Sequence, residues 1–182
     1  MVAVQRLISI SRAFSEPALF KGQVELSTIV RKAAVTYIEL ARVHNIAVTT
    51  KIEVEPAWAV THEAAITEVL EALLSNAIKY TPDNGRVEIR LLLDKSGVYQ
   101  IRIGDSGIGI SQENFEKVFQ PFYRTAGAHE SSRPGTGLGL AFVRAVVDAA
   151  GGNVHAEKSR LGGAELVVNL LAAEAAEKMT GD

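Results

Sequence analysis

The chain has 182 residues, of which 47% are hydrophobic and 22% charged, a composition typical of one folded domain with its own core. This balance excludes a disordered tail, a collagen-like fibre and a coiled-coil rod. The net charge of −2 argues against nucleic-acid binding, which usually requires a basic excess. There are no cysteines, so disulfides, thiolate zinc sites and a cysteine nucleophile are excluded. No apolar run is long enough to span a membrane, and the N-terminus does not resemble a signal peptide.

Hydrophobic periodicity and turn residues predict five elements in the first 60 residues. They are a helix at 2–14, a short strand at 23–26, a helix at 28–43, a strand at 46–54 and a very short strand at 58–60. Ser27 is the expected N-cap of the second helix. The buried side of that helix is expected to hold Ile29, Ala33, Tyr37, Leu40 and Ala41.

The remaining elements follow the same signals. They are a helix at 61–80 with Thr61 as its cap, a hairpin of strands at 87–93 and 98–103, a short helix at 112–119, a helix at 140–149, and strands at 154–157 and 164–170. The tail from Ala172 is expected to fray. This order predicts an α+β fold, a two-layer α/β sandwich in which helices cover one face of the sheet.

Asn76 and Lys79 lie near the end of the helix expected at 61–80. Because they are three residues apart, they share one helix face. An amide oxygen is a neutral, hard ligand that suits Mg²⁺, and a lysine is a point charge that suits phosphate. Read alone, the pair is more typical of a solvated helix face with a lysine at its C-terminal end.

The segment Gly104-Asp105-Ser106-Gly107-Ile108-Gly109-Ile110 follows a predicted strand directly. A carboxylate at a strand end can accept a hydrogen bond from an exocyclic amine such as that of adenine. Glycines at 107 and 109 let the backbone approach a flat ring closely. The alternative is a tight glycine turn in which the aspartate caps its own backbone.

Three phenylalanines precede Arg124. Phe115, Phe119 and Phe122 recur at helical spacing, which is typical of a core stripe. Arg124 lies just beyond them and could reach a phosphate.

The segment Gly135-Thr136-Gly137-Leu138-Gly139-Leu140 opens a predicted helix. Backbone N–H groups at a helix N-terminus form an anion site. The spacing differs from both the P-loop pattern and the G-x-G-x-x-G pattern. Without other evidence, the segment could equally be a flexible loop end.

Together and in this order, the four features resemble the ATP-binding catalytic domain of sensor histidine kinases, in the superfamily that includes gyrase B, Hsp90 and MutL. Residues 68–82 resemble the N box, 104–110 the G1 box, 115–124 the F box and 135–140 the G2 box. The resemblance covers about residues 23–171. It implies the Bergerat-type fold, with a mixed, mostly antiparallel sheet. It also divides the chain into the end of a dimerisation helix with a linker, at 1–22, and the ATP-binding domain, at 23–182.

The resemblance implies a role for each matching residue. Asn76 would bind Mg²⁺, and Lys79 and Arg124 would contact the phosphates of ATP during phosphoryl transfer. Asp105 would accept a hydrogen bond from the adenine amino group. The other residues of the nucleotide site would be Tyr80, Gly107, Gly109, Ile110, Phe122, Gly135, Thr136, Gly137, Leu138 and Gly139. Residues 120–135 would form a lid over the nucleotide.

The sequence departs from the family pattern at one position. Ala72 stands four residues before Asn76, where the family usually has a second asparagine or, in ATPases, a glutamate base. Glu71 is one residue away and faces about 100° around the helix, so we expect poor ATP hydrolysis. His62-Glu63 superficially resembles a phosphoacceptor motif, but it begins the N-box helix and is expected to be structural.

The resemblance also implies partners and location. Since residues 1–14 resemble the end of a dimerisation helix, the chain is expected to be a piece of a longer sensor kinase. Its partners would be the dimerisation and phosphoacceptor domain of the same kinase and the receiver domain of a response regulator. Nucleic acid and membrane are not expected to bind this piece. The full-length protein is expected to be a homodimer that works in the cytoplasm, either free or as the cytoplasmic part of a membrane-anchored sensor.

Two other functions stay open at this point. One is an anti-sigma-type serine kinase, although such proteins generally lack the F box. The other is a nucleotide-binding pseudokinase that acts as a regulatory or interaction module, which the alanine at position 72 favours.

Overall fold

The structure is a computed structural model that describes residues 2–20, 22–130 and 135–173. Its centre is a five-stranded sheet in the order β2-β4-β5-β7-β6. The strands are β2 (Ala47–Ile52), β4 (Arg86–Leu93), β5 (Val98–Asp105), β6 (Asn153–Lys158) and β7 (Ala164–Leu171). Strand β2 runs parallel to β4, and the other neighbours pair antiparallel. The prediction of a mixed, mostly antiparallel sheet is therefore confirmed.

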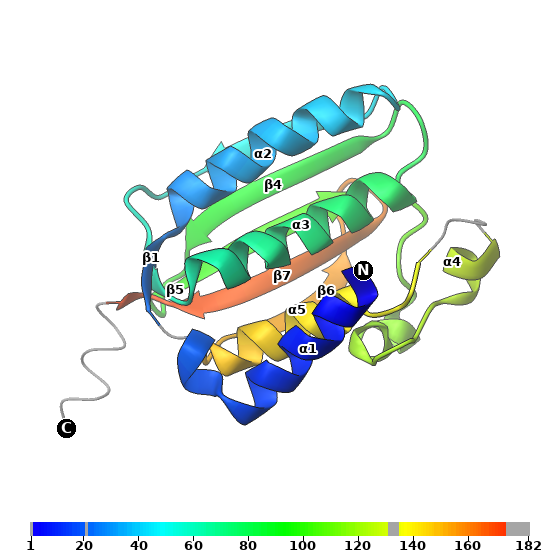
Figure 1. The fold of residues 1–182 in the computed structure, drawn as a ribbon. Coiled ribbons are helices and arrows are strands. Elements are labelled where there is room, and N and C mark those ends of the chain that lie inside the picture. The colour runs from blue at the N-terminus through cyan, green and yellow to red at the C-terminus, as the bar shows by residue number, and fades with distance from the viewer. Residues whose placement is uncertain (1, 21, 131–134, 174–182) are drawn as a thin grey trace.

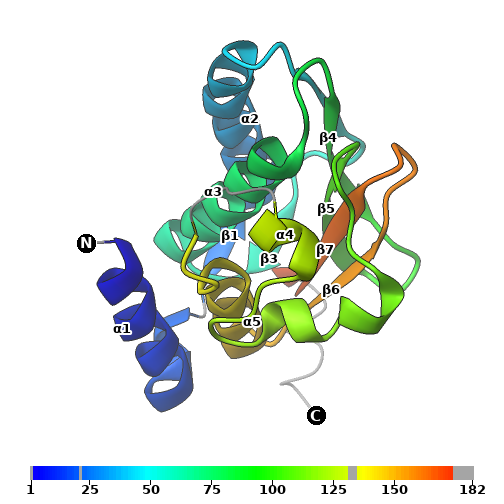
Figure 2. The ribbon, with the colours of Figure 1, turned by 90° about the vertical axis from the view of Figure 1, so that its right-hand side faces the viewer.

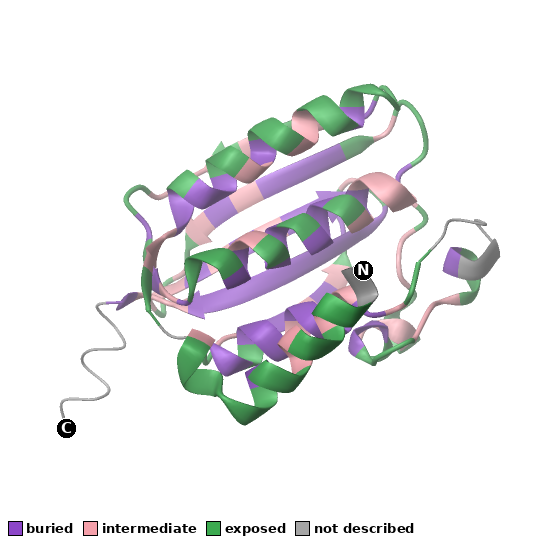
Figure 3. Ribbon diagram, in the orientation of Figure 1, coloured by how far each residue is buried: buried purple, intermediate pink, exposed green. Residues whose placement is uncertain are grey.

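Three helices cover one face of this sheet (Figures 1 and 2). They are α2 (Leu26–Arg42), α3 (Glu63–Tyr80) and α5 (Gly139–Ala149). Strand residues facing them alternate with outward residues, so that Val87, Ile89 and Leu91 of β4 are fully buried. The apolar positions predicted for α3 are buried as well, from Ile66 to Ala77. Figure 3 shows the resulting pattern, with buried residues along the sheet and exposed residues on the outer sides of the helices.

The opposite face of the sheet carries a network of ion pairs. Glu165 of β7 is 4% exposed and accepts hydrogen bonds from Arg90 (3.1 Å) and from Nε of Arg102 (2.9 Å). Glu88 of β4 is paired in the same way with Arg160. Burial by itself raises the pKa of Glu88, but the hydrogen bond and charge of Arg160 lower it overall. Long arginine side chains therefore cover buried carboxylates on this face.

A second, two-stranded sheet lies at one end of the domain. It pairs β1 (Gln23–Glu25) with β3 (Trp58–Val60) antiparallel. At the end of β1, Glu25 is the N-cap of α2 and accepts hydrogen bonds from the backbone N–H groups of Ser27 (3.1 Å), Thr28 (2.9 Å) and Ala57 (2.9 Å). Ser27 is thus inside the helix and donates its own hydroxyl to Glu25 (2.6 Å). The prediction of Ser27 as the cap was wrong because the longer carboxylate of Glu25, two residues earlier, reaches three backbone N–H groups as well as the Ser27 hydroxyl.

Helix α1 (Val2–Ser15) and the short 3-10 helix η1 (Pro17–Phe20) lie outside the two layers, along α5. Ala13 of α1 is buried and packs with Ala145 and Ala149 of α5. None of the described helices is long and apolar enough to cross a membrane.

Several other expectations need correction. His62, not Thr61, is the cap residue of α3, and Thr61 is buried. Leu40 is 54% exposed, whereas Val30 and Ala34 are buried on α2 instead.

The helix expected at 112–119 is two 3-10 turns, η2 (Gln112–Asn114) and η3 (Lys117–Phe119). Ala172 bridges to Ala59 and Ala173 is buried, so these two residues do not fray; the rest of the tail lies outside the described residues, as does part of the predicted lid.

Candidate functional site

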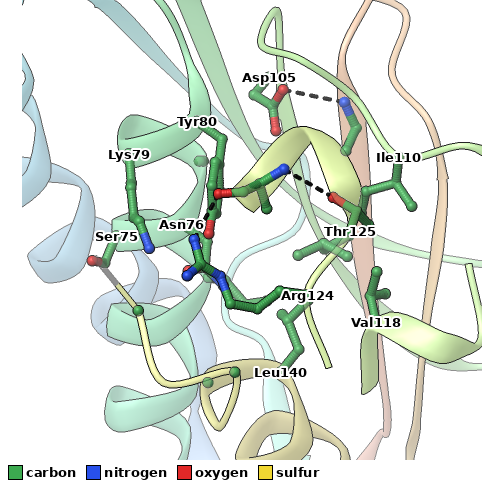
Figure 4. A pocket seen from close by; sticks show the side chains of 18 of the residues that line it. Ser75, Asn76, Lys79, Tyr80, Asp105, Ile110, Val118, Arg124, Thr125 and Leu140 are labelled. Carbon is green, nitrogen blue, oxygen red and sulfur yellow. Dashed lines mark hydrogen bonds between the residues drawn. The ribbon is translucent and has the colours of Figure 1, made fainter. Parts of the chain in front are cut away.

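A cavity of about 400 Å³ opens beside α3, within the volume range of small-ligand pockets. Its walls come from α3, the end of β5, the start of α5, the segment around Arg124, and the short helix α4 (Ala126–Glu130). Residues far apart in the chain therefore meet here, among them Asn76, Asp105, Arg124 and Gly139. Figure 4 shows the labelled side chains of α3 and Asp105 around this space.

Asp105 ends β5 and is 8% exposed. Burial raises the pKa of its carboxyl group, although two backbone donors oppose the shift. These donors are the N–H groups of Gly107 (2.8 Å) and Ala164 (3.1 Å), and both reach the same oxygen, Oδ1. Among the described residues, no hydrogen bond reaches Oδ2. The carboxylate is thus held firmly by one oxygen while the other can serve a ligand in the cavity.

Two glycines are required next to Asp105 because there is no room for a side chain. A Cβ on Gly107 would lie 2.3 Å from the carbonyl oxygen of Tyr80, and a Cβ on Gly163 would lie 2.1 Å from Oδ1 of Asp105. Through these contacts the loop after β5 touches the last turn of α3 and the start of β7. Gly107 was predicted to let the backbone approach a flat ring, but the close approach in the structure is to the backbone of Tyr80.

A glycine-rich segment faces the C-terminal turns of α3. Lys79 extends toward it, and its Nζ lies 2.7 Å from the point where a Cβ on Gly135 would be. Gly137 has a φ of +72° and lies against the backbone of Phe122, so any other residue there would be strained. Helix α5 then begins at Gly139 without a side-chain cap. Its first N–H groups have no partner within the helix, which is the arrangement that favours an anion.

Arg124 is fixed near the same region. Its Nη2 donates to the carbonyl oxygen of Ala128 (2.6 Å), and the N–H of Ala128 donates to Oγ1 of Thr125 (3.2 Å). The short helix α4 is therefore attached to the residue that was predicted to contact phosphate.

The charges around the cavity are unequal. The charged residues in its lining are Arg6, Lys79, Arg124 and one acid, Asp105. The walls can therefore bind a ligand that offers a hydrogen-bond donor at the Asp105 end and several negative charges near α5.

The structure brings most of the predicted residues together. The cavity is lined by Asn76, Lys79, Tyr80, Asp105, Gly109, Ile110, Arg124, Gly135, Thr136, Gly137 and Gly139. Three predicted residues are not part of this lining. Gly107 packs behind Asp105, Leu138 is buried with its N–H pointing at Thr136, and the side chain of Phe122 is 66% exposed.

Other lining residues were missed by sequence reasoning. Leu73, Ile103, Val118 and Leu166 form an apolar part of the wall, and in sequence they are indistinguishable from ordinary core positions. Arg6 comes from α1, which the prediction placed outside the domain. Gly163 does not line the cavity but touches Asp105. It could have been noticed from the Gly162-Gly163 pair, but this contact depends on the pairing of β5 with β7.

The surroundings of Ala72 and Glu71 on α3 show whether either could supply a base for ATP hydrolysis. Ala72 is buried in the core and Glu71 is exposed, and neither lines the cavity. Among the described lining residues, Asp105 is therefore the sole carboxylate. It is held by the N–H of Gly107, at the opposite end of the cavity from Asn76.

Residues 61–174 match the sequence profile of the family described as histidine kinase-, DNA gyrase B- and HSP90-like ATPase. This match covers more than half of the chain. The chain belongs to this ATPase family. The predicted resemblance is thereby confirmed, and the described sheet with its helices agrees with the predicted fold class.

Named relatives of this ATPase domain are sensor kinases. The sensor histidine kinase CpxA of Escherichia coli K12 is 40% identical over 104 residues, which are 57% of this chain and 22% of CpxA. The chain thus matches about a fifth of this relative's length.

Two solved structures share the fold of the ATPase domain. The mycobacterial sensor histidine kinase MprB has a TM-score of 0.74 at 26% identity, covering 83% of this chain and 98% of that one. The histidine kinase ThkA in complex with the response regulator protein TrrA has a TM-score of 0.68 at 25% identity, covering 92% and 48% of the two chains.

Proposed function

We propose that the chain is the ATP-binding catalytic part of a two-component sensor histidine kinase. It would transfer a phosphoryl group from Mg-ATP to a histidine on the dimerisation domain of the same kinase, from which an aspartate of a response regulator would receive it. The observation that carries this proposal is the polarity of the cavity, with a free carboxylate oxygen at one end and cations with an uncapped helix N-terminus at the other.

The base of the nucleotide would lie at the Asp105 end. Oδ2 of Asp105 would accept a hydrogen bond from the adenine amino group, while Oδ1 keeps its bonds to Gly107 and Ala164. Gly109 and Ile110 line the same end and would contact the ring. Because Asp105 cannot move without losing two backbone bonds, its position favours a base with an amino group at that point.

The phosphates would lie between α3 and the start of α5. Lys79 and Arg124 would contact phosphate oxygens, and N–H groups of the segment from Gly135 to Gly139 would surround them. Tyr80 supports the lysine, since Nζ of Lys79 lies 4.7 Å from the centre of its ring. These groups act by positioning the phosphates and neutralising their charge, which is the main protein contribution to phosphoryl transfer.

Asn76 would supply the protein ligand for Mg²⁺. The described residues hold no group of three His, Cys, Asp or Glu side chains that could bind a metal. Mg²⁺ is commonly held by few protein groups together with substrate phosphates and water, so a single amide oxygen beside the phosphate region fits it. When bound, the ion would neutralise charge on the phosphates.

The same cavity predicts slow hydrolysis of ATP. A water molecule near the last phosphate would need a base, and neither Ala72 nor Glu71 offers one to the cavity. Transfer to a histidine would instead use the acceptor's own ring nitrogen as nucleophile.

The proposal extends to partners and location. The acceptor would be the dimerisation domain of the same kinase, to which residues 1–22 would belong, and the full-length protein would be a cytoplasmic homodimer or the cytoplasmic part of a membrane-anchored one. The relative ThkA, solved with a response regulator protein, supports a receiver domain as the second partner.

Calorimetric titration tests the site. ADP and a non-hydrolysable ATP analogue are titrated with and without Mg²⁺ into the wild-type chain, Asp105→Asn and the control Asp83→Asn, an exposed aspartate outside the cavity. We expect micromolar, Mg²⁺-assisted binding by the wild type and the control, and at least about tenfold weaker binding by Asp105→Asn. Absence of binding by the wild type would contradict the proposal.

The alanine at position 72 favours one second candidate, a nucleotide-binding regulatory module without transfer activity. Labelled ATP and a separately produced dimerisation domain distinguish the two. Labelled histidine in that domain supports the kinase, and tight nucleotide binding without label supports the module.

A further inference from the structure

Helix α1 is fixed against α5 in a defined register. Ala13 packs with Ala145 and Ala149 in the C-terminal half of α5, and small side chains at these positions allow the helices to approach closely. Arg6 precedes Ala13 by seven residues, about 10 Å along a helix. This offset places Arg6 beside Gly139, the first residue of α5, so the two helices run in the same direction (Figure 1).

The guanidinium group of Arg6 reaches the cavity. Its Nη1 lies 3.2 Å from the point where a Cβ on Gly139 would be, and Nδ2 of Asn76 lies 3.7 Å from that point. Arg6 is half-buried and is the one residue among the described part of α1 that lines the cavity. No hydrogen bond or ion pair joins it to another described residue. A cation held at an uncapped helix N-terminus without an acidic partner favours an anionic ligand.

The order of groups along α3 indicates which part of a nucleotide Arg6 would meet. The carbonyl of Tyr80 touches Gly107, at the Asp105 end. Asn76 lies one helical turn earlier, roughly 6 Å away. Arg6 lies close to Asn76, since both reach Gly139. A nucleotide with its base at Asp105 therefore extends its phosphates toward Arg6.

We propose that Arg6 binds the terminal phosphate of the nucleotide, so that docking of α1 on α5 and binding of a triphosphate stabilise each other. The inference rests on the proposed function, because it assumes the orientation of the nucleotide. A guanidinium group can contact two phosphate oxygens at once. Because coupling between two binding events is reciprocal, a triphosphate holds α1 against the domain more firmly than a diphosphate does.

Calorimetry on four chains tests the contact. They are the wild type, Arg6→Ala, Arg6→Lys and the control Arg12→Ala, an exposed arginine of the same helix outside the cavity. We expect Arg6→Ala to weaken binding of the Mg²⁺-bound ATP analogue about tenfold, the typical effect of losing a charged hydrogen bond, and binding of ADP less than about threefold. Arg6→Lys should restore part of the difference, and Arg12→Ala should match the wild type.

Hydrogen exchange supplies a readout that a merely structural role would not change. Amides of α1 should exchange more slowly with the ATP analogue than with ADP, and this difference should disappear in Arg6→Ala. Equal affinities for Arg6→Ala and Arg12→Ala would overturn the inference, as would tighter binding by Arg6→Ala. If Asp105→Asn still loses binding in that case, the proposed function stands without Arg6; if the wild type binds neither nucleotide, both fail.

Discussion

Gly163 lies so close to Asp105 that a Cβ on the glycine would stand 2.1 Å from the carboxylate oxygen Oδ1 and 2.5 Å from the N–H nitrogen of Gly107. The start of β7 therefore determines where the carboxylate at the end of β5 can lie. Asp105 is the one acid in the described cavity lining. Its position therefore depends on a residue that is 58 positions later in the sequence.

Replacing this glycine should impair the site. We expect Gly163→Ala to displace Asp105 and to weaken ADP binding at least about tenfold, because one hydrogen bond to a charged group is lost. The control is Gly151→Ala, which has a φ of +80° and no atom within 4 Å of its Cβ. That variant should lose about 1 kcal/mol of stability through backbone strain but keep its affinity for ADP. Equal affinities for the two variants would contradict the role of Gly163.

Glu25 should make stability depend on acid pH. Burial opposes ionisation, but hydrogen bonds from Ala57, Ser27 and Thr28 outweigh it and lower the pKa from 4.5 to about 2. Because the pKa is lower in the folded state, the stabilisation is fully present above the unfolded value of 4.5 and is lost as the pH falls toward 2. Urea unfolding between neutral pH and about pH 3 measures this loss.

The matched variant for that experiment is Glu25→Gln. We expect it to lower the free energy of unfolding by about 1 kcal/mol at neutral pH, the usual contribution of a helix cap. The difference from the wild type should shrink as the pH falls. A difference that is constant with pH would mean that the charge of Glu25 is not involved.

Glu165 should contribute more to stability than an exposed ion pair does. Its carboxylate is 4% exposed and lies between Arg90 and Arg102. Removing it takes the shared buried acid from both arginines, although Arg90 keeps Glu88 at 3.5 Å and Arg102 keeps Glu157. We therefore expect Glu165→Ala to cost roughly 2 kcal/mol, through the lost charged hydrogen bonds. The control Glu39→Ala removes an exposed pair with Arg42 and should cost less than about 0.5 kcal/mol. Similar midpoints of urea unfolding for both variants would show that the outer face of the sheet does not depend on this network.

Much of the fold could be predicted from the sequence because periodicity is a local property. Alternation in β4 and β5 and the apolar positions of α3 predicted these strands and this helix correctly. Helix caps were less predictable, since the choice between Ser27 and Glu25 depends on the N–H of Ala57, which another segment brings close. Leu40 was predicted to be buried from spacing alone, yet it is exposed near the end of α2.

The candidate site was predictable where each motif carries its own chemistry. Asn76, Asp105 and the segment at 135–139 meet at one cavity as expected. Arg6 and Gly163 could not be found in this way, because their roles arise from the packing of α1 on α5 and from the pairing of β5 with β7. Phe122 was predicted to be part of the nucleotide site, yet it has a positive φ and an exposed side chain, while its N–H donates to Gly137.

The central claim, that Asp105 selects adenine by its amino group, is tested most directly by comparing ADP with inosine diphosphate. The two nucleotides share their ribose and phosphates, but inosine has a carbonyl oxygen where adenine has the amino group. If this carbonyl oxygen faced Oδ2 of Asp105, two acceptors would meet and repel each other. Neither would have a hydrogen-bond donor. We predict by calorimetry that inosine diphosphate binds at least about a hundredfold more weakly than ADP to the wild-type chain, and that Asp105→Asn reduces this preference. Equal affinities of the wild-type chain for the two nucleotides would contradict the account.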